Sequence, residues 1–307
     1  MTETNAKDGL DWLSQVFSFS KLSTFARCPR LFFYKYVLRR REPTSAALLF
    51  GRGVHGGMET DNLAKLRGEK LSLAAVLEAA VEEFRGEAND NDIKVDVDVF
   101  AKEHERQLAI FDETGQRAAI RPLPGSVEAG FQVALQVFDG PRRPAADVLV
   151  EGYTDVVSES RDGKVVVDFK TAGRPASAKE VENNLQLALQ AIGAEAGAGG
   201  IVSFVKEGKQ RATTKTRTAV IDDAARNRVL LWIGGTITSI RAALRSGDFP
   251  QCAPQDGKCQ GCEFRRFCWP AAPTQEQVRL ISLSPVGTMA PQEWRESRAA
   301  KAAREGK

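Results

Sequence analysis

The fold of this chain is decided by the stretch from Val148 to Thr171, which reads VLVEGYTDVVSESRDGKVVVDFKT. Runs of valine and other strand-forming residues lie on both sides of Arg161-Asp-Gly-Lys164, a segment rich in the residues that tight turns prefer. The pattern predicts two antiparallel strands, at residues 148–158 and 165–171, that form a β-hairpin.

Three charged side chains are expected to lie on one face of this hairpin. Side chains alternate between the two faces of a strand, so Asp168 and Lys170 point the same way. A two-residue turn at Asp162-Gly163 makes the numbers of facing residues add up to an odd number, and 155 plus 168 is odd. Asp155 is therefore expected beside Asp168, with Cβ atoms about 5–8 Å apart, and a register shift of two residues preserves this.

Two carboxylates this close repel each other unless a cation lies between them. Oxygen ligands of this kind suit Mg²⁺ or Mn²⁺, and the ammonium group of Lys170 would then lie beside the ion. There it could orient or help to deprotonate an attacking water and offset charge on a phosphate. The alternative is a solvent-facing strand on which Asp155 and Lys170 form a surface ion pair.

The composition is that of a globular chain. Its 307 residues, 42% hydrophobic and 27% charged, predict one large or two small domains at roughly 150 residues each. The formal charge of +3 is too small to indicate nucleic-acid binding by itself. No apolar run approaches the roughly 20 residues that cross a bilayer, and Met1 to Asp11 is polar, unlike a secretory signal. We therefore expect a cytoplasmic protein without a membrane partner.

Hydrophobic periodicity outside the hairpin predicts further strands and helices. Alternation from residue 127 to residue 137 indicates a half-buried strand, and helical spacing indicates an amphipathic helix from Ser72 to Gly86. More strands are expected at residues 200–205 and 213–221, and more helices at 98–114, 179–196 and 223–246. Together these elements predict an α/β fold with the hairpin in its sheet.

The order of charged residues in the hairpin resembles the PD-(D/E)xK nuclease superfamily, in which a first acid precedes a strand carrying D-x-K or E-x-K. Here the matching positions are Asp155 and Asp168-Phe-Lys170. The resemblance implies a restriction-endonuclease-like fold with a mixed central sheet flanked by helices. The implied catalytic residues are Asp155, Asp168, Lys170 and Gln186, and the implied ligands of Mg²⁺ or Mn²⁺ are His55, Asp155 and Asp168.

Two of these residues come from the RecB-like branch of the superfamily. It adds a histidine on an upstream helix, matched by His55 in Gly51-Arg-Gly-Val-His55, and a glutamine on the following helix, matched by Gln186. The tyrosine usual four residues after this glutamine is Gln190 here. Packing is the alternative role for His55. It already explains the other histidine, His104, which shares a helical stripe with phenylalanines and a leucine.

The cysteines predict a metal site near the C-terminal end of the fold. Cys259, Cys262 and Cys268 are spaced as C-x2-C-x5-C, which places three thiolates on one compact turn and leaves Cys28 or Cys252 as the fourth ligand. Zinc and iron both accept four thiolates. The residues around Cys28 resemble the N-terminus of iron-sulfur RecB-like nucleases, such as the AddB nuclease domain and CRISPR-associated RecB-like exonucleases. That resemblance implies a 4Fe-4S cluster on Cys28, Cys259, Cys262 and Cys268, with structural Zn²⁺ as the alternative.

These features predict six segments along the chain. They are a polar leader (1–17), an N-terminal segment with the first cluster cysteine (18–50), a helical insert with His55 (51–121), a nuclease core (122–248), a cysteine-rich cluster segment (249–270) and a peripheral tail (271–307).

The expected function is that of a metal-dependent DNA nuclease. The resemblance implies an exonuclease acting on single strands or DNA ends in recombination, repair or phage/CRISPR-type DNA processing. Candidate DNA contacts are Arg27, Arg30, Lys35, Arg265 and Arg266. No G-x-x-x-x-G-K-[ST] motif occurs, so a helicase or recombination partner would be a separate chain. The alternatives are a non-catalytic DNA-binding iron-sulfur scaffold protein and a sequence-specific endonuclease with the same metal centre; the oligomeric state is not indicated.

Overall fold

The computed structural model describes residues 16–40, 45–138, 144–207, 212–253 and 257–269. The chain forms two compact units, Met1–Lys258 and Cys259–Lys307. The first unit contains all the described strands, and the second contributes the short helix α11 (Arg265–Cys268). Residues 1–15 of the expected leader and the whole expected tail, 271–307, lie outside the described residues.

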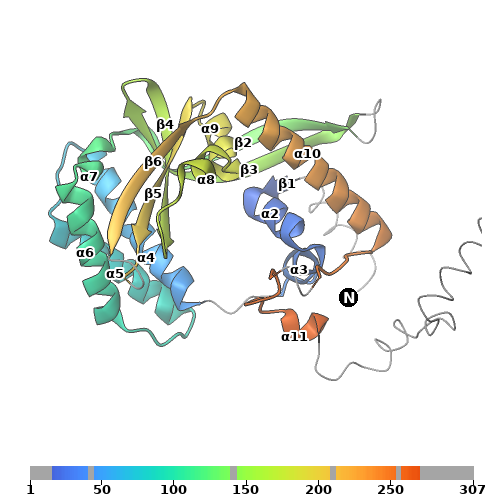
Figure 1. The fold of residues 1–307 in the computed structure, drawn as a ribbon, viewed down its shortest axis with the longest axis horizontal. Coiled ribbons are helices and arrows are strands. Elements are labelled where there is room, and N and C mark those ends of the chain that lie inside the picture. The colour runs from blue at the N-terminus through green and yellow to red at the C-terminus, as the bar shows by residue number, and fades with distance from the viewer. Residues whose placement is uncertain (1–15, 41–44, 139–143, 208–211, 254–256, 270–307) are drawn as a thin grey trace, which may run out of the picture. The chain divides into compact units, whose positions relative to one another are not determined.

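A six-stranded mixed sheet forms the centre of the first unit (Figure 1). Its strands are β1 (Val16–Ser18), β2 (Pro122–Phe138), β3 (Pro144–Ser160), β4 (Gly163–Ala172), β5 (Ala198–Val205) and β6 (Thr213–Val220). The order is β1-β3-β4-β5-β6, and β2 pairs with β3. β1 runs parallel to β3 and β4 parallel to β5, whereas the other pairs are antiparallel. The expected polar leader, 1–17, is wrong at its end, because Val16 and Phe17 belong to β1.

Helices cover both faces of the sheet, which confirms the expected mixed sheet flanked by helices (Figure 1). The helical elements are α2 (Phe19–Arg27), α3 (Pro29–Phe32), the π-helical turn η1 (Phe33–Val37), α4 (Ala46–Leu66), α5 (Leu73–Asp90), α6 (Val97–Glu113), α7 (Gln116–Ala119), α8 (Ala178–Glu182), α9 (Leu185–Gly193) and α10 (Asp223–Ser246). One buried cluster joins α2, α9 and α10 to the sheet, and another joins α4, α5 and α6 to it. No described helix is long and apolar enough to cross a membrane.

The long helix expected at residues 223–246 is α10. The side chain of Asp222 accepts the backbone N–H of Ala225 at 2.7 Å and caps its start. Gly247 ends it in the left-handed region, with a φ of 73°. Its apolar stripe is buried against the sheet, so local capping and tertiary packing agree.

The single helix expected at residues 179–196 is wrong, since the structure has α8 and α9 there. Ser177 and Glu180 form a capping box at the start of α8. Asn184 caps α9, because its side chain accepts the backbone N–H of Leu187 at 3.0 Å. The helix that carries Gln186 therefore begins at a cap of its own.

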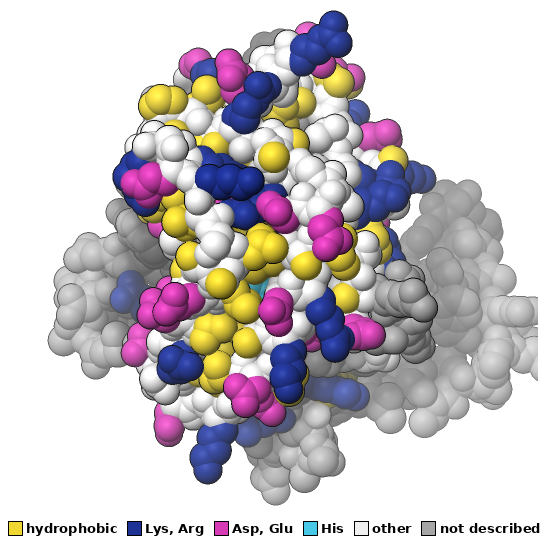
Figure 2. Space-filling view, turned by 90° about the vertical axis from the view of Figure 1, so that its left-hand side faces the viewer, with side chains coloured by type: hydrophobic (Ala, Val, Ile, Leu, Met, Phe, Trp, Pro, Cys, Tyr) yellow, Lys and Arg dark blue, Asp and Glu magenta, His cyan; other side chains and the backbone are white. Residues whose placement is uncertain are grey.

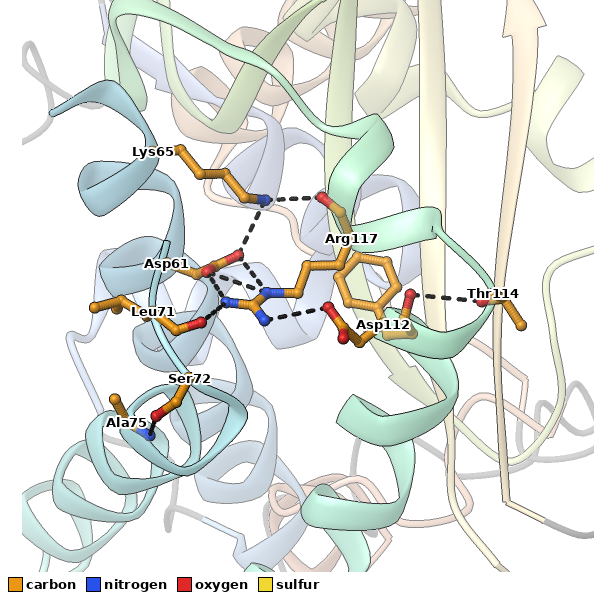
Figure 3. A network of polar contacts seen from close by, with 9 residues as sticks. Asp61, Lys65, Leu71, Ser72, Ala75, Asp112, Thr114 and Arg117 are labelled. Atoms are coloured by element: carbon orange, nitrogen blue, oxygen red, sulfur yellow. Dashed lines mark hydrogen bonds and ion pairs between the residues drawn. The ribbon is translucent and has the colours of Figure 1, made fainter. Parts of the chain in front are cut away.

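Residues 51–121, the expected helical insert, contain most of α4 and all of α5 to α7. A buried ion-pair network holds α4 to α7 (Figure 3). Arg117 contacts Asp61 at 2.5 Å and donates to the carbonyl of Leu71 at 2.9 Å, and Lys65 lies 3.0 Å from Asp61. Burial alone would raise the pKa of Asp61, but hydrogen bonds from Arg117 and Lys65 hold it below its ordinary value. The network thus fixes the helix that carries His55.

In the hairpin, the numbers of facing residues add up to an odd number, as expected. The turn lies one residue earlier than expected. Ser160 faces Gly163 and Val156 faces Val167, and 160 plus 163 and 156 plus 167 both give 323. The two turn residues are therefore Arg161 and Asp162. The shift moves every facing sum by two and leaves each side chain on its predicted face.

Candidate functional site

The sheet opens along one edge of β3. On that edge β4 pairs with β3 from Ser160 to Val156, and β1 pairs with it from Glu151 to Leu149. β2 occupies the opposite edge alongside both segments. Residues 152–155 therefore have no neighbour on the first edge among the described strands, and this gap is called the sheet opening here.

Asp155 lies at the β4 end of the sheet opening and reaches across it. Its Oδ2 atom accepts the backbone N–H of Phe169 at 2.7 Å. In the hairpin register the next facing pair after Val156 and Val167 would be Asp155 and Asp168, but the strands separate before it forms. Burial raises the pKa of Asp155, and the negative charge of Asp168 acts in the same direction. The two acids thus meet where the strands part.

His55 approaches Asp155 from α4. Its Nδ1 atom lies 3.5 Å from Oδ2 of Asp155, and its ring stands edge-on to Phe169 at 6.3 Å. The surrounding glycines let α4 pack closely on α5: a Cβ at Gly53 would lie 2.9 Å from the carbonyl oxygen of Ala80. The glycine-rich stretch therefore has a packing role, and His55 itself faces the acids.

Asp168 is held from two sides. Its Oδ1 atom accepts a hydrogen bond from Nε2 of Gln186 at 3.4 Å, and its Oδ2 atom lies 2.9 Å from Nζ of Lys170. The Asp168 side chain is only 3% exposed, whereas that of Lys170 is 43% exposed. Oδ2 is buried and makes no hydrogen bond within the described structure besides this ion pair. The carboxylate is thus fixed in direction while the ammonium group stays within reach of solvent and substrate.

Glu128 of β2 is a site residue that the sequence analysis missed. The register places it opposite Asp155, because Val127 faces Val156 and Ala129 faces Thr154. Its φ of 47° is rare for a residue with a side chain and costs roughly 1–3 kcal/mol. Burial, followed by the charges of nearby carboxylates, raises the pKa of Glu128 to about 7. In the sequence it is an ordinary polar position of an alternating strand, so only the pairing of two distant strands reveals it.

The donor atoms of the site fit a divalent cation. Ligand atoms of His55, Glu128 and Asp155 all lie within 4.8 Å of one another. A set of one imidazole nitrogen and carboxylate oxygens suits Mg²⁺ or Mn²⁺. Crowded, half-buried carboxylates also repel each other, which adds to the effect of burial in raising the pKa values of Asp155 and Glu128, and a cation relieves this repulsion.

Gln190, which replaces the expected tyrosine, is a packing residue in this structure. It is 2% exposed, and its Nε2 atom donates to the backbone carbonyl of Tyr153 at 3.0 Å. This bond holds β3 two residues before Asp155. His104 is likewise packed as expected, with its ring 5.6 Å from that of Phe100 and no exposed surface.

Cys28 and Cys252 lie next to each other in the first unit. Burial would raise the pKa of the Cys28 thiol, but hydrogen bonds from the backbone and thiol of Cys252 and from neighbouring backbone N–H groups lower it. Either of these two cysteines was expected as the fourth thiolate ligand, and the resemblance selects Cys28. In the second unit, Cys259, Cys262 and Cys268 occupy a compact turn, where the N–H of Cys262 donates to the carbonyl of Cys259 at 3.3 Å. The first unit thus contains Cys28, and the second contains the other three expected cluster ligands. A cluster bound by all four cysteines stays a prediction.

The candidate DNA-contact residues have local roles in the structure. Arg27 donates to the carbonyl of Lys258 at 3.1 Å, and Arg30 and Lys35 lie over the rings of Phe33 and Tyr36 at 5.8 and 6.0 Å. Arg265 and Arg266 belong to α11 in the second unit. Their contact with DNA stays a prediction. On the face over α5 to α7, the described basic and acidic side chains are interspersed, so this face does not favour a polyanion (Figure 2).

Fold and site together define a class of protein: a mixed sheet that opens between two strands, with an acid on each and a lysine two residues after the second acid. Residues 16–269 match the family model described as the PD-(D/E)XK nuclease superfamily. The chain therefore belongs to this superfamily of nucleases.

A solved structure agrees with the fold. A protein of Eubacterium rectale, described as a candidate exonuclease, matches with a TM-score of 0.51 and 14% identity over 92% of this chain and 98% of that one. The protein SSO0001 matches with a TM-score of 0.31 and 15% identity over 76% of this chain and 89% of that one. A search of curated proteins found no match.

Proposed function

We propose that this chain is a divalent-metal-dependent DNA nuclease that acts as an exonuclease on single strands or free DNA ends. The observation that carries the proposal is the meeting of His55, Asp155 and the Asp168–Lys170 pair at the sheet opening. Family membership supports nuclease chemistry, and the Eubacterium rectale neighbour supports the exonuclease assignment.

Mg²⁺ or Mn²⁺ would be held by His55, Asp155 and Asp168, and we add Glu128 to this set. When bound, the ion would supply a water of lowered pKa and a positive charge for the phosphate oxygens. Lys170 lies against Asp168 and is partly exposed, so its ammonium group can meet an incoming phosphate and offset negative charge as the phosphodiester is attacked. The hydrogen bond from Gln186 orients the Asp168 carboxylate, so that it can contact both Lys170 and the metal ion.

We also propose the RecB-like iron-sulfur subtype, with a 4Fe-4S cluster on Cys28, Cys259, Cys262 and Cys268. The compact C-x2-C-x5-C turn and the lowered pKa of the Cys28 thiol support thiolate ligation. Such a cluster would join positions more than two hundred residues apart and act as a structural staple. A separate helicase or recombination partner would supply unwound DNA.

The function is tested with end-labelled single- and double-stranded oligonucleotides, incubated with Mn²⁺ or with a chelator. The expected result is metal-dependent shortening of single strands, while a circular single strand of the same sequence stays intact. Cleavage of the circle would replace the exonuclease assignment by an endonuclease. Binding without any cleavage, unchanged in Asp168→Asn, would instead favour the non-catalytic DNA-binding protein.

A further inference from the structure

A hollow of about 730 Å³ lies directly beside the proposed catalytic lysine. Its volume is within the range of roughly 300–1,000 Å³ that is usual for pockets holding a small ligand. Lys170 and Gln186 form the part of its wall that it shares with the metal site. A strand whose phosphate reaches Lys170 would therefore have its neighbouring base or sugar at this hollow.

The wall of the hollow includes an aromatic ring that is supported from behind. Phe19, at the start of α2, lines the hollow and lies 5.4 Å from the ring of Trp232 of α10. Phe19 is only partly buried, at the margin of the cluster that joins α2 and α10 to the sheet. A ring that is held on one side and open on the other is a suitable platform for a nucleobase.

The rest of the lining combines apolar and polar side chains with the exposed ion pair of Arg174 and Glu180. Ala172 and Ile201 come from adjacent strands, and Asn183 and Asn184 come from the segment between α8 and α9. The side chain of Asn184 is already committed to capping α9. Asn183 is exposed, and its amide can turn its free oxygen toward a base edge.

We propose that this hollow is a base pocket, in which one nucleobase of a single-stranded substrate stacks on Phe19 while the adjoining phosphate lies at Lys170. The inference rests on the proposed function and adds to it a subsite for one nucleobase beside the proposed catalytic lysine. Bases in a duplex are stacked on one another and paired, so a base must be unstacked before its face can meet Phe19. The pocket therefore favours single strands and frayed ends over intact duplex.

The test combines a change in the protein with a change in the substrate. A fluorescently labelled single-stranded heptanucleotide is bound by the full chain in Ca²⁺, and a base is removed from one position at a time by an abasic spacer. For wild type, one or two positions should show a loss of affinity of about tenfold, which corresponds to about 1.4 kcal/mol. For Phe19→Ala, the intact oligonucleotide should bind about tenfold more weakly, and the same spacers should cost nothing further.

Two variants and one control separate stacking from packing. Phe19→Tyr should keep the dependence on the base, whereas Phe19→Leu, which remains apolar, should lose it. Phe33→Ala removes another partly buried ring from the same cluster, and it should keep the base dependence of wild type. Melting temperatures show which variants are folded. If Phe19→Ala does not fold, the comparison of Phe19→Leu with Phe19→Tyr decides.

The base pocket is excluded if spacers cost the same in wild type and in Phe19→Leu, or if no position of the oligonucleotide shows a base dependence. Cleavage of the same oligonucleotide by wild type in Mn²⁺ is measured in parallel. Cleavage without base dependence removes the pocket and leaves the nuclease. Base-dependent binding without cleavage removes the nuclease and leaves a single-strand binding site.

Discussion

The carboxylate of Asp155 accepts the backbone N–H of Phe169 across the sheet opening at 2.7 Å. This bond replaces a main-chain partner where β3 and β4 separate, so one oxygen has a structural role as well as a place in the metal site. The same oxygen is the one nearest to His55. Structure and chemistry at this position can therefore be separated by a substitution that keeps the acceptor and removes the charge.

Asp155→Asn is such a substitution. The amide oxygen can still accept the Phe169 N–H, so the unfolding midpoint should stay close to that of wild type. Loss of the negative charge should weaken Mn²⁺ binding, and cleavage should fall by about a hundredfold or more. Calorimetric titration with Mn²⁺ and a cleavage assay measure the two effects. Normal cleavage with unchanged metal affinity would remove Asp155 from the centre.

Replacing Glu128 by glycine should raise the stability of the fold and lower its affinity for the metal. Glu128→Gly removes the strain of a φ of 47°, and so should stabilise the metal-free protein by about 1 kcal/mol. It also removes a ligand, and Mn²⁺ affinity should fall about tenfold or more. Glu128→Gln keeps the strain but loses the charge, and should weaken the metal without stabilising the fold. Chemical denaturation with and without Mn²⁺ tests both. A Glu128→Gln protein with wild-type metal affinity would contradict the assignment.

Local signals in the sequence were sufficient for the hairpin and for α10. The alternation of side chains has a period of two, so the faces of Asp155 and Asp168 survive an error in the turn position. The helix α10 has a cap at each end, Asp222 and Gly247, and a continuous apolar stripe between them. In both cases the deciding residues are neighbours along the chain.

Long-range pairing explains what the sequence could not show. The sheet opening exists because β1 and β4, which are far apart in the chain, share one edge of β3. Glu128 enters the site only through the register of β2 with β3. The break between α8 and α9 is different. Asn184 is a recognisable cap, but apolar residues at helical spacing on both sides of it favoured one continuous helix.

His104 predicts a dependence of stability on pH. It is fully buried, and burial lowers its pKa from 6.5 to about 4. The unfolded chain therefore takes up the proton first, so stability is retained above pH 6.5 and lost as the pH falls toward 4, by up to about 3 kcal/mol. His104→Leu should remove this dependence. His55→Gln, which changes the other of the two histidines, should keep it. Identical pH profiles for wild type and His104→Leu would show that another group controls acid unfolding.

The network around Asp61 predicts a large effect of a single buried charge. Arg117→Met leaves the Asp61 carboxylate with only Lys65, and should destabilise the protein by about 3–5 kcal/mol. Glu69→Gln breaks the exposed pair with Arg67 and should leave the unfolding midpoint unchanged. Denaturant unfolding compares them. Because α4 carries His55, Arg117→Met should also weaken Mn²⁺ binding at temperatures where it is folded, and intact metal affinity would show that α4 is held by packing alone.

The cysteines predict a metal content that distinguishes iron from zinc. An anaerobic preparation with a 4Fe-4S cluster should be brown, with broad absorbance near roughly 400 nm from thiolate-bound iron. Cys262→Ser should lose the iron and the colour. Cys252→Ser is the matched control, because Cys252 lies beside Cys28 but is not in the proposed ligand set, and this variant should keep both. A colourless wild type with stoichiometric zinc would contradict the iron-sulfur cluster. Loss of this zinc in Cys252→Ser would establish the zinc alternative, with Cys252 as one of its ligands.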